Sequence, residues 1–114
     1  MVEGRREKKE EQIREIVARV IERESNKSAL ITVTRVVLDD KARSGTVFFT
    51  ALPVSGEESA LNFLKRKRPE LREELKKQLP IHPLPFLDVA IDEGEKARQT
   101  IDALLKEGEK NDLR

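Results

Sequence analysis

The sequence contains no cysteine, tryptophan or tyrosine, and its single histidine is His82. The absence of cysteine excludes disulfides, thiolate metal ligands and a cysteine nucleophile. One histidine excludes metal sites built from several imidazoles, and His82 lies in a proline-rich loop where we expect an ordinary surface or packing role. The five glycines lack the spacing of phosphate-binding loops. We therefore expect a protein that is not an enzyme and that holds no cofactor or metal.

Long hydrophobic runs are also missing. Apolar stretches are a few residues long, whereas a helix that crosses a bilayer needs roughly 20. Residues 1–12 are charged and do not resemble a secretory signal. We expect a monomeric, cytoplasmic protein with no membrane partner. The 114 residues suffice for one domain, and we expect residues 1–107 to form it and residues 108–114 to be a tail.

The charge of the chain is abundant but unevenly distributed. Charged residues make up 39% of the sequence, yet the net charge is only +1. Residues 65–77 contain seven basic and three acidic side chains, a net charge of +4, which leaves −3 for the remainder. A basic cluster of this kind is typical of a nucleic-acid contact, because phosphates relieve the repulsion between its charges. A solvated surface that nearby glutamates partly neutralise explains the cluster equally well.

Hydrophobic spacing predicts an α+β domain with the order helix, strand, strand, kinked helix pair, strand, helix. Apolar side chains three and four apart predict a helix over residues 6–24. β-Branched residues predict strands over 29–38 and 45–52, and the short polar link between them favours an antiparallel hairpin. We expect a third strand over 86–91, followed by a helix that Asp92 caps and that ends near Gly108.

A kinked helix pair is expected between the second and third strands. Ser55 and Glu58 have the spacing of a capping box for the first helix. Pro69 lacks an amide proton and clashes with the preceding turn, so it is predicted to interrupt the helix. A leucine then recurs every four residues from Leu71 to Leu79, which predicts a second helix in a new direction. The basic run therefore lies at the kink.

The basic run and the hairpin loop supply the candidate RNA-binding residues. No aromatic residue is interleaved with the run, so the sequence does not indicate stacking on unpaired bases, and recognition of RNA shape and phosphates is favoured. Basic residues between positions 5 and 14 are offset by glutamates, which is typical of a solvated helix. The residues that we expect to contact phosphates are Lys65, Arg66, Lys67, Arg68, Arg72, Lys76 and Arg43.

Three motifs follow one another along the chain: VTRV at 33–36 leading through Asp40 to VFF at 47–49, FLDVAID at 86–92, and Ile101-Asp102 followed by Leu104-Leu105. With these motifs in this order, the chain resembles the bacterial ribosome-binding factor A family from the first helix to residue 107. The resemblance implies a type II KH-like fold, a three-stranded sheet packed on helices, in which a kinked helix pair replaces the glycine loop of typical KH domains. At the kink Lys67-Arg68-Pro69 stands where the family usually has an Ala-x-Gly-like stretch.

Two functions remain open at this point. The resemblance implies a factor that associates with the small (30S) ribosomal subunit and its 16S rRNA and assists late maturation. It would act by binding one RNA conformation more tightly and so shifting its population. The alternative is a protein-interaction module with a KH-like fold and no RNA partner, which the nearly neutral net charge supports. Salt dependence separates the two, because binding through phosphates weakens steeply as salt rises.

Overall fold

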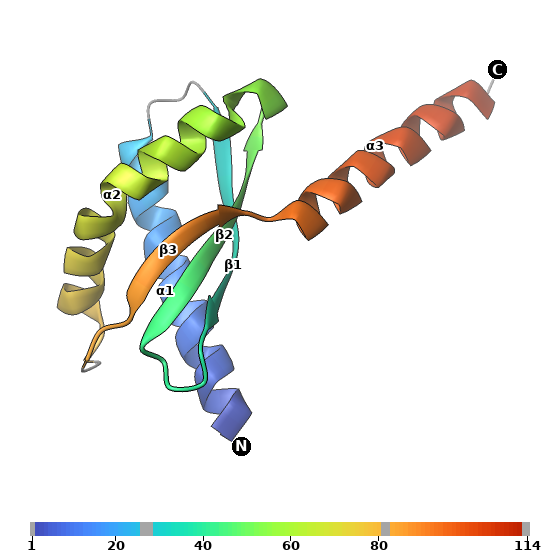
Figure 1. Ribbon diagram of the computed structural model, residues 1–114. Coiled ribbons are helices and arrows are strands. Elements are labelled where there is room, and N and C mark those ends of the chain that lie inside the picture. The colour runs from blue at the N-terminus through green and yellow to red at the C-terminus, as the bar shows by residue number, and fades with distance from the viewer. Residues whose placement is uncertain (1, 26–28, 81–82, 113–114) are drawn as a thin grey trace.

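The computed structural model describes residues 2–25, 29–80 and 83–112. The described residues form a three-stranded sheet with two helices packed on one face and a third helix that leaves the sheet (Figure 1). This arrangement confirms the α+β class, the order of the elements and the KH-like architecture that the resemblance implies. The elements are α1 (Val2–Glu24), β1 (Leu30–Leu38), β2 (Ser44–Leu52), the 3-10 turn η1 (Val54–Gly56), α2 (Glu57–Gln78), β3 (Phe86–Ile91) and α3 (Glu93–Asp112).

The strand β2 occupies the centre of the sheet. It pairs with β1 in antiparallel fashion, as the hairpin prediction requires, and with β3 in parallel. A parallel pair needs a long crossover connection, and α2 supplies it. Alternate residues of β2 face the helices, so Val47 and Phe49 are fully buried while Phe48 is half-buried on the opposite, open face. The sheet therefore has one face covered by helices and one face that is only partly covered.

A bulge at Thr34 changes the alternation of β1. The pairing with β2 shifts register between Val33 and Arg35, so Thr34 is an extra residue. In a regular strand, residues 33 and 36 would face opposite sides. The inserted residue reverses the phase, and Val33, Val36 and Leu38 are all buried against the helices.

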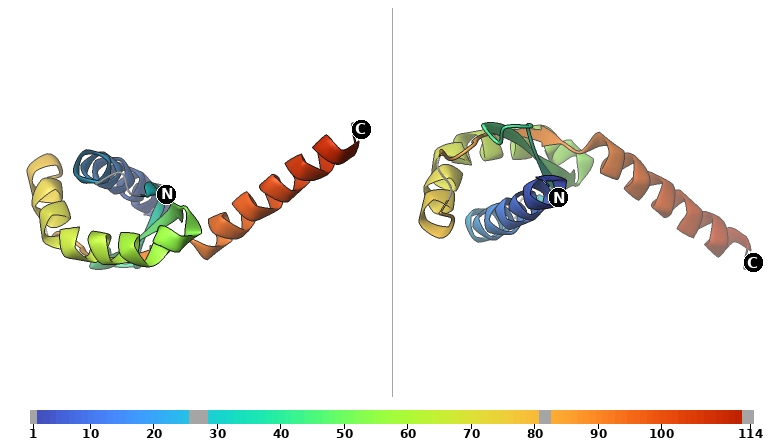
Figure 2. Two further views of the ribbon diagram at one scale, coloured as in Figure 1. Left: turned by 90° about the horizontal axis from the view of Figure 1, so that it is seen from above. Right: turned by 90° about the horizontal axis from the view of Figure 1, so that it is seen from below.

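The predicted division of α2 at Pro69 is wrong, because α2 is one helix from Glu57 to Gln78. The helix does change direction midway, as Figures 1 and 2 show. Pro69 deprives the carbonyl of Lys65, four residues earlier, of its helical donor. The Nε atom of Arg68 donates to this carbonyl instead, at 3.1 Å. The side chain of a basic residue thus compensates for the proline, and the helix continues.

The bend lets both arms of α2 contribute to the core. Leu64 before the proline and Leu71 and Leu75 after it are fully or almost fully buried. They pack with the apolar stripe of α1 and the inner face of the sheet in one hydrophobic cluster. A straight helix of 22 residues spans about 33 Å, so bending is a direct way to follow a small, twisted sheet.

The capping box predicted for Ser55 and Glu58 is also wrong. Ser55 lies inside η1, and the N-cap residue of α2 is Gly56, which makes no side-chain hydrogen bond. A capping side chain needs an extended backbone at its own residue. The 3-10 turn that begins directly after Pro53 removes that conformation from Ser55.

The helix α3 projects away from the sheet (Figures 1 and 2). It continues beyond Gly108 to Asp112, so the predicted end at this glycine is wrong. No described glycine has the positive φ of a helix-terminating cap. Its large apolar side chains do not cover the sheet, and Ile101, Leu104 and Leu105 are 56–62% exposed. None of the described helices is long and apolar enough to span a membrane.

Asp92 joins β1, β2 and α3 through one buried carboxylate. Its Oδ1 atom accepts a hydrogen bond from the amide of Glu95 at 3.0 Å, which confirms its predicted role as the cap of the last helix. Its Oδ2 atom accepts from the hydroxyl of Thr34 at 2.6 Å and from Nε of Arg35 at 3.3 Å. Its own amide donates to the carbonyl of Phe49 at 2.7 Å. Burial alone would raise the pKa of Asp92, but these donors outweigh it and hold the pKa below its ordinary value.

Replacing Asp92→Asn should lower the free energy of unfolding by about 1–2 kcal/mol at neutral pH, measured by urea denaturation. A lowered folded pKa contributes stability that is complete above the unfolded pKa and is lost as the pH falls through the folded value. The difference between native and variant proteins should therefore shrink between about pH 6 and about pH 2.5. Asp40→Asn removes the same charge at a fully exposed position and is the control. An equal difference at both pH values would contradict the prediction.

Candidate nucleic-acid interface

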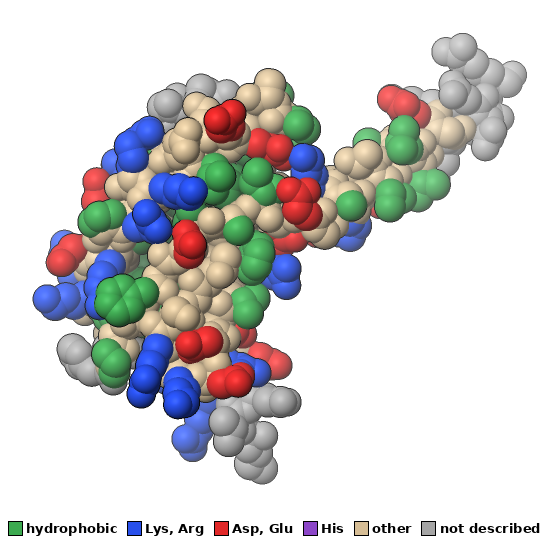
Figure 3. All heavy atoms as spheres, in the orientation of Figure 1, with side chains coloured by type: hydrophobic (Ala, Val, Ile, Leu, Met, Phe, Trp, Pro, Cys, Tyr) green, Lys and Arg blue, Asp and Glu red, His purple; other side chains and the backbone are tan. Residues whose placement is uncertain are grey.

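The six basic residues of α2 that the sequence analysis selected fall into two groups on different sides of the helix. Lys65, Arg68, Arg72 and Lys76 are separated by three or four residues, which is the spacing of one helical row. We call these four residues the basic row. Lys65 and Lys76 are exposed, and Arg68 and Arg72 reach toward β3. Figure 3 shows Lys and Arg side chains gathered over α2 on the face that includes the open side of the sheet.

Arg66 and Lys67 lie toward α1 instead. Arg66 lines a small hollow that Ser25 and Phe63 also border. The ammonium group of Lys67 is 3.6 Å from a carboxylate oxygen of Glu24 on α1 and 3.3 Å from one of Glu70. It also lies 5.7 Å from the ring centre of Phe63. The structure therefore does not bring all six predicted residues of α2 onto one surface, and Lys67 is engaged within the protein.

Arg43 joins the basic row from the hairpin. Its side chain is exposed, and its carbonyl accepts a hydrogen bond from the amide of Phe86 at 2.9 Å, which places Arg43 at the start of β3. The preceding turn is fixed by Asp39, whose carboxylate accepts from the amide of Arg43 at 2.8 Å and from the hydroxyl of Ser44 at 3.2 Å. These donors, the Arg43 amide foremost, lower the pKa of Asp39. The side chain of Arg43 is thus presented from a rigid turn.

Two arginines of the basic row bridge α2 and β3. Nη1 of Arg72 donates to the carbonyl of Pro85 at 3.2 Å, and its guanidinium carbon lies 4.4 Å from the ring centre of Phe86. Nη1 of Arg68 lies 3.4 Å from a carboxylate oxygen of Asp88. Planar guanidinium groups stack favourably on aromatic rings, so Arg72 is held by two contacts. The cationic surface therefore extends from α2 around the edge strand β3.

Phe86 belongs to this surface and was not among the residues predicted from the sequence. The basic run itself contains no aromatic residue, and folding brings Phe86 to Arg72 from 14 positions away. The exposure of Phe86 could have been predicted from strand alternation, because Phe86 lies on the same strand face as the charged Asp88 and that face is expected to meet solvent. Its side chain is 70% exposed.

Two hollows adjoin Phe86 and differ in charge. One, of about 380 Å³, is lined by Arg68, Arg72, prolines and apolar side chains, without a carboxylate. The other, of about 590 Å³, lies over β2 and β3 and includes Asp39 and Asp88 together with Arg68, which lines both hollows. Both volumes are in the range of small-ligand sites. Among the described residues, no three His, Asp or Glu side chains are placed to hold a metal ion together.

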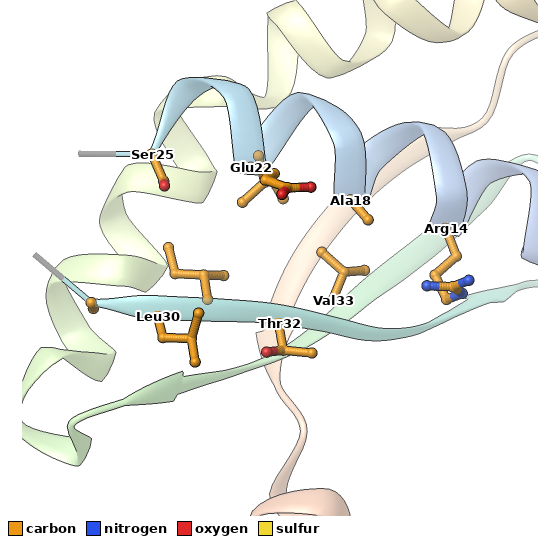
Figure 4. A pocket seen from close by; sticks show the side chains of 10 residues that line it. Arg14, Ala18, Glu22, Ser25, Leu30, Thr32 and Val33 are labelled. Carbon is orange, nitrogen blue, oxygen red and sulfur yellow. The ribbon is translucent and has the colours of Figure 1, made fainter. Parts of the chain in front are cut away.

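A further hollow, of about 420 Å³, lies between α1 and β1 (Figure 4). Ala18 and Glu22 of α1 lie across from Leu30 and Thr32 of β1, and Arg14 stands at one end. The lining is mainly hydrocarbon, and the guanidinium of Arg14 is already bonded to the carboxylate of Glu11 on the same helix. This hollow offers no free cluster of cations and is not part of the candidate interface.

Comparisons with known proteins agree on one family. A family model described as "Ribosome-binding factor A" matches residues 5–105. A ribosome-binding factor A of Thermodesulfovibrio yellowstonii is 32% identical over 97 residues, which is 85% of this chain and 80% of that protein. The crystal structure of ribosome-binding factor A from Thermus thermophilus superposes with a TM-score of 0.68 at 25% identity, covering 75% of this chain and 93% of that one.

A second structural relative shows the fold alone. It is a homology model of the Thermus thermophilus factor that was fitted into a cryo-EM map of its complex with 30S, with a TM-score of 0.61 and 24% identity. The match covers 71% of this chain and 88% of that one.

Alanine substitutions in the two groups of basic residues should differ in their effect on the free energy of unfolding. Lys67→Ala removes contacts with Glu24 and Phe63 and should lower the free energy of unfolding by about 0.5–1 kcal/mol in urea denaturation. Lys65→Ala, at an exposed position two residues earlier, should change it by less than about 0.5 kcal/mol. A larger loss for Lys65→Ala than for Lys67→Ala would show that the division of the basic run is wrong.

Proposed function

Since the chain belongs to the ribosome-binding factor A family, we propose that it binds the small (30S) ribosomal subunit through 16S rRNA and assists late maturation of that subunit. The cryo-EM complex of the Thermus thermophilus relative with 30S supports the small subunit as the partner. On this proposal the protein acts in the cytoplasm as a monomeric binding factor and catalyses no reaction.

One observation carries the proposal: the basic row continues around the edge of the sheet to Arg43. Exposed lysines and arginines that bind phosphates release condensed counterions, which gives favourable and salt-dependent binding. Acidic side chains elsewhere in the chain offset the total charge, so the near-neutral sum does not argue against a local contact.

The anchoring of the arginines supports recognition of a defined RNA shape. Arg72 is fixed by Pro85 and Phe86, and Arg68 by the carbonyl of Lys65 and by Asp88. Cations held in place lose less conformational entropy on binding than free side chains. A rigid row fits one spacing of phosphates better than another and shifts RNA toward the conformation that has it.

Arg66 and Lys67 take a secondary part in this proposal. They lie on the α1 side of the helix, and RNA that contacted Lys67 would have to displace Glu24 and Glu70. Arg66 is exposed and extends the surface around the helix. The order of importance is therefore the basic row with Arg43, then Arg66, then Lys67.

The alternative, a protein-interaction module without an RNA partner, is favoured by a different observation. Ile101, Leu104 and Leu105 of α3 are exposed together on a helix that has few contacts with the sheet. Exposed apolar patches commonly mark protein contacts. Binding through this helix would depend little on salt, in contrast to binding through the basic row.

Reversing two charges of the basic row should weaken binding to small subunits and reduce its salt dependence. Lys65→Glu with Lys76→Glu alters two exposed lysines, and the slope of log affinity against log salt should fall by about 2. The measurement is co-sedimentation with purified small ribosomal subunits at several salt concentrations. Lys8→Glu with Lys9→Glu makes the same change in net charge on exposed residues of α1 and should leave the slope nearly unchanged.

Three outcomes are informative. A reduced slope for the α2 variant alone supports the proposal. Equal effects of the two variants would show that total charge, rather than the basic row, governs binding. Binding that is insensitive to salt and to both variants would favour the protein-interaction alternative.

A further inference from the structure

Phe86 is the most exposed of the large hydrophobic side chains that the structure describes, at 70%. The guanidinium of Arg72 lies over its ring, 4.4 Å from the centre. A phenylalanine whose ring has a guanidinium over one face stays 70% exposed only if the opposite face of the ring is largely open. The Phe48 ring on the same sheet face is half-buried under Arg35, whose Nε atom is bound to Asp92. Of these two stacked pairs, only that of Phe86 offers an open ring.

The backbone holds the ring of Phe86 in a fixed place. The amide of Phe86 donates to the carbonyl of Arg43 at 2.9 Å, and Phe86 pairs with Ser44 in the parallel ladder. Pro85 before it is buried and Leu87 after it is half-buried. A flat apolar surface that is rigid before binding loses little conformational entropy when a ligand stacks on it.

Charge on the two sides of the ring separates a place for phosphate from a place for a base. The hollow beside Arg68 and Arg72 contains no carboxylate and suits a phosphate. The hollow over the sheet is lined by Asp39 and Asp88 and by Arg68, which is paired with Asp88 at 3.4 Å. Its two carboxylates outnumber its one cation and can accept hydrogen bonds from the amino groups of bases. A nucleotide lying across Phe86 would have its backbone on the arginine side and its base over the sheet.

We propose that Phe86 and Arg72 form a stacking platform for one unpaired RNA base, with Arg68 and Arg72 holding the adjacent phosphates. This inference rests on the proposed function and adds to it. The basic row recognises phosphates in any sequence, whereas the platform requires a base that is not paired in a helix. Sequence-tolerant stacking on an aromatic ring next to a cationic groove is a known physical basis of single-strand binding. The platform directs the protein to a single-stranded segment of its RNA target.

The chain has no tryptophan, so Phe86→Trp creates a protein with a single indole at the platform. Its fluorescence should be quenched by an eight-nucleotide oligoadenylate and not by an abasic ribose-phosphate chain of the same length. Val54→Trp places the indole at an exposed site on the turn before α2 and is the control, for which no quenching is expected. Phe86→Leu should weaken oligoadenylate binding about 10-fold and leave the salt slope unchanged, because a ring carries no net charge.

The outcomes distinguish this inference from the proposed function. Salt-dependent binding of oligoadenylate without quenching at position 86, or with undiminished affinity of Phe86→Leu, overturns the platform and leaves the proposed function in place. Equal quenching by the abasic chain overturns it as well. Small subunits that bind while oligoadenylate does not also overturn the platform alone. If the native protein binds neither small subunits nor oligoadenylate, both the platform and the proposed function are overturned.

Discussion

The buried carboxylate of Asp92 fixes the relative position of three elements in this protein. It accepts hydrogen bonds from Thr34 and Arg35 on β1 and from the first turn of α3, while its amide donates to Phe49 on β2. The bulge at Thr34 admits three apolar residues of β1 to the core, and Asp92 is the partner of the bulged residue. The Asp92 carboxylate therefore helps to set which residues of the edge strand β1 face the core and the direction in which α3 leaves the sheet.

Pro69 weakens the hydrogen bonding of its own helix, whereas Asp92 adds hydrogen bonds between elements. The proline removes a backbone hydrogen bond from α2, and Arg68 replaces that bond with its own side chain. The bend allows Leu64 and Leu71 to enter the same core and brings Arg72 to the edge of β3. A residue that weakens an isolated helix thus fits this helix to its sheet and positions the cations that it carries.

Patterns of short range could be predicted from the sequence, and pairings of long range could not. The strand over residues 45–52 was predicted from its β-branched residues, and because a strand has a period of two, Val47 and Phe49 share the face that is buried. The parallel pairing of β3 with β2 depends on a crossover, and no local pattern reports it. The approach of Phe86 to Arg72 follows from that crossover. The division of the basic run, in contrast, follows from helical spacing and could have been predicted from the sequence. The error at Ser55 was local and arose from a turn that competes with capping.

The outward direction of α3 changes the shape of the particle in solution. The chain measures 59 × 36 × 18 Å and has a radius of gyration of 16.4 Å, whereas a compact chain of this length has roughly 13 Å. The helix accounts for about 30 Å of that length. Tumbling about the long axis is faster than end-over-end rotation, so relaxation rates measured for α3 and for the sheet depend on the orientation of each bond. A protein of 13.1 kDa will diffuse as a larger, elongated body.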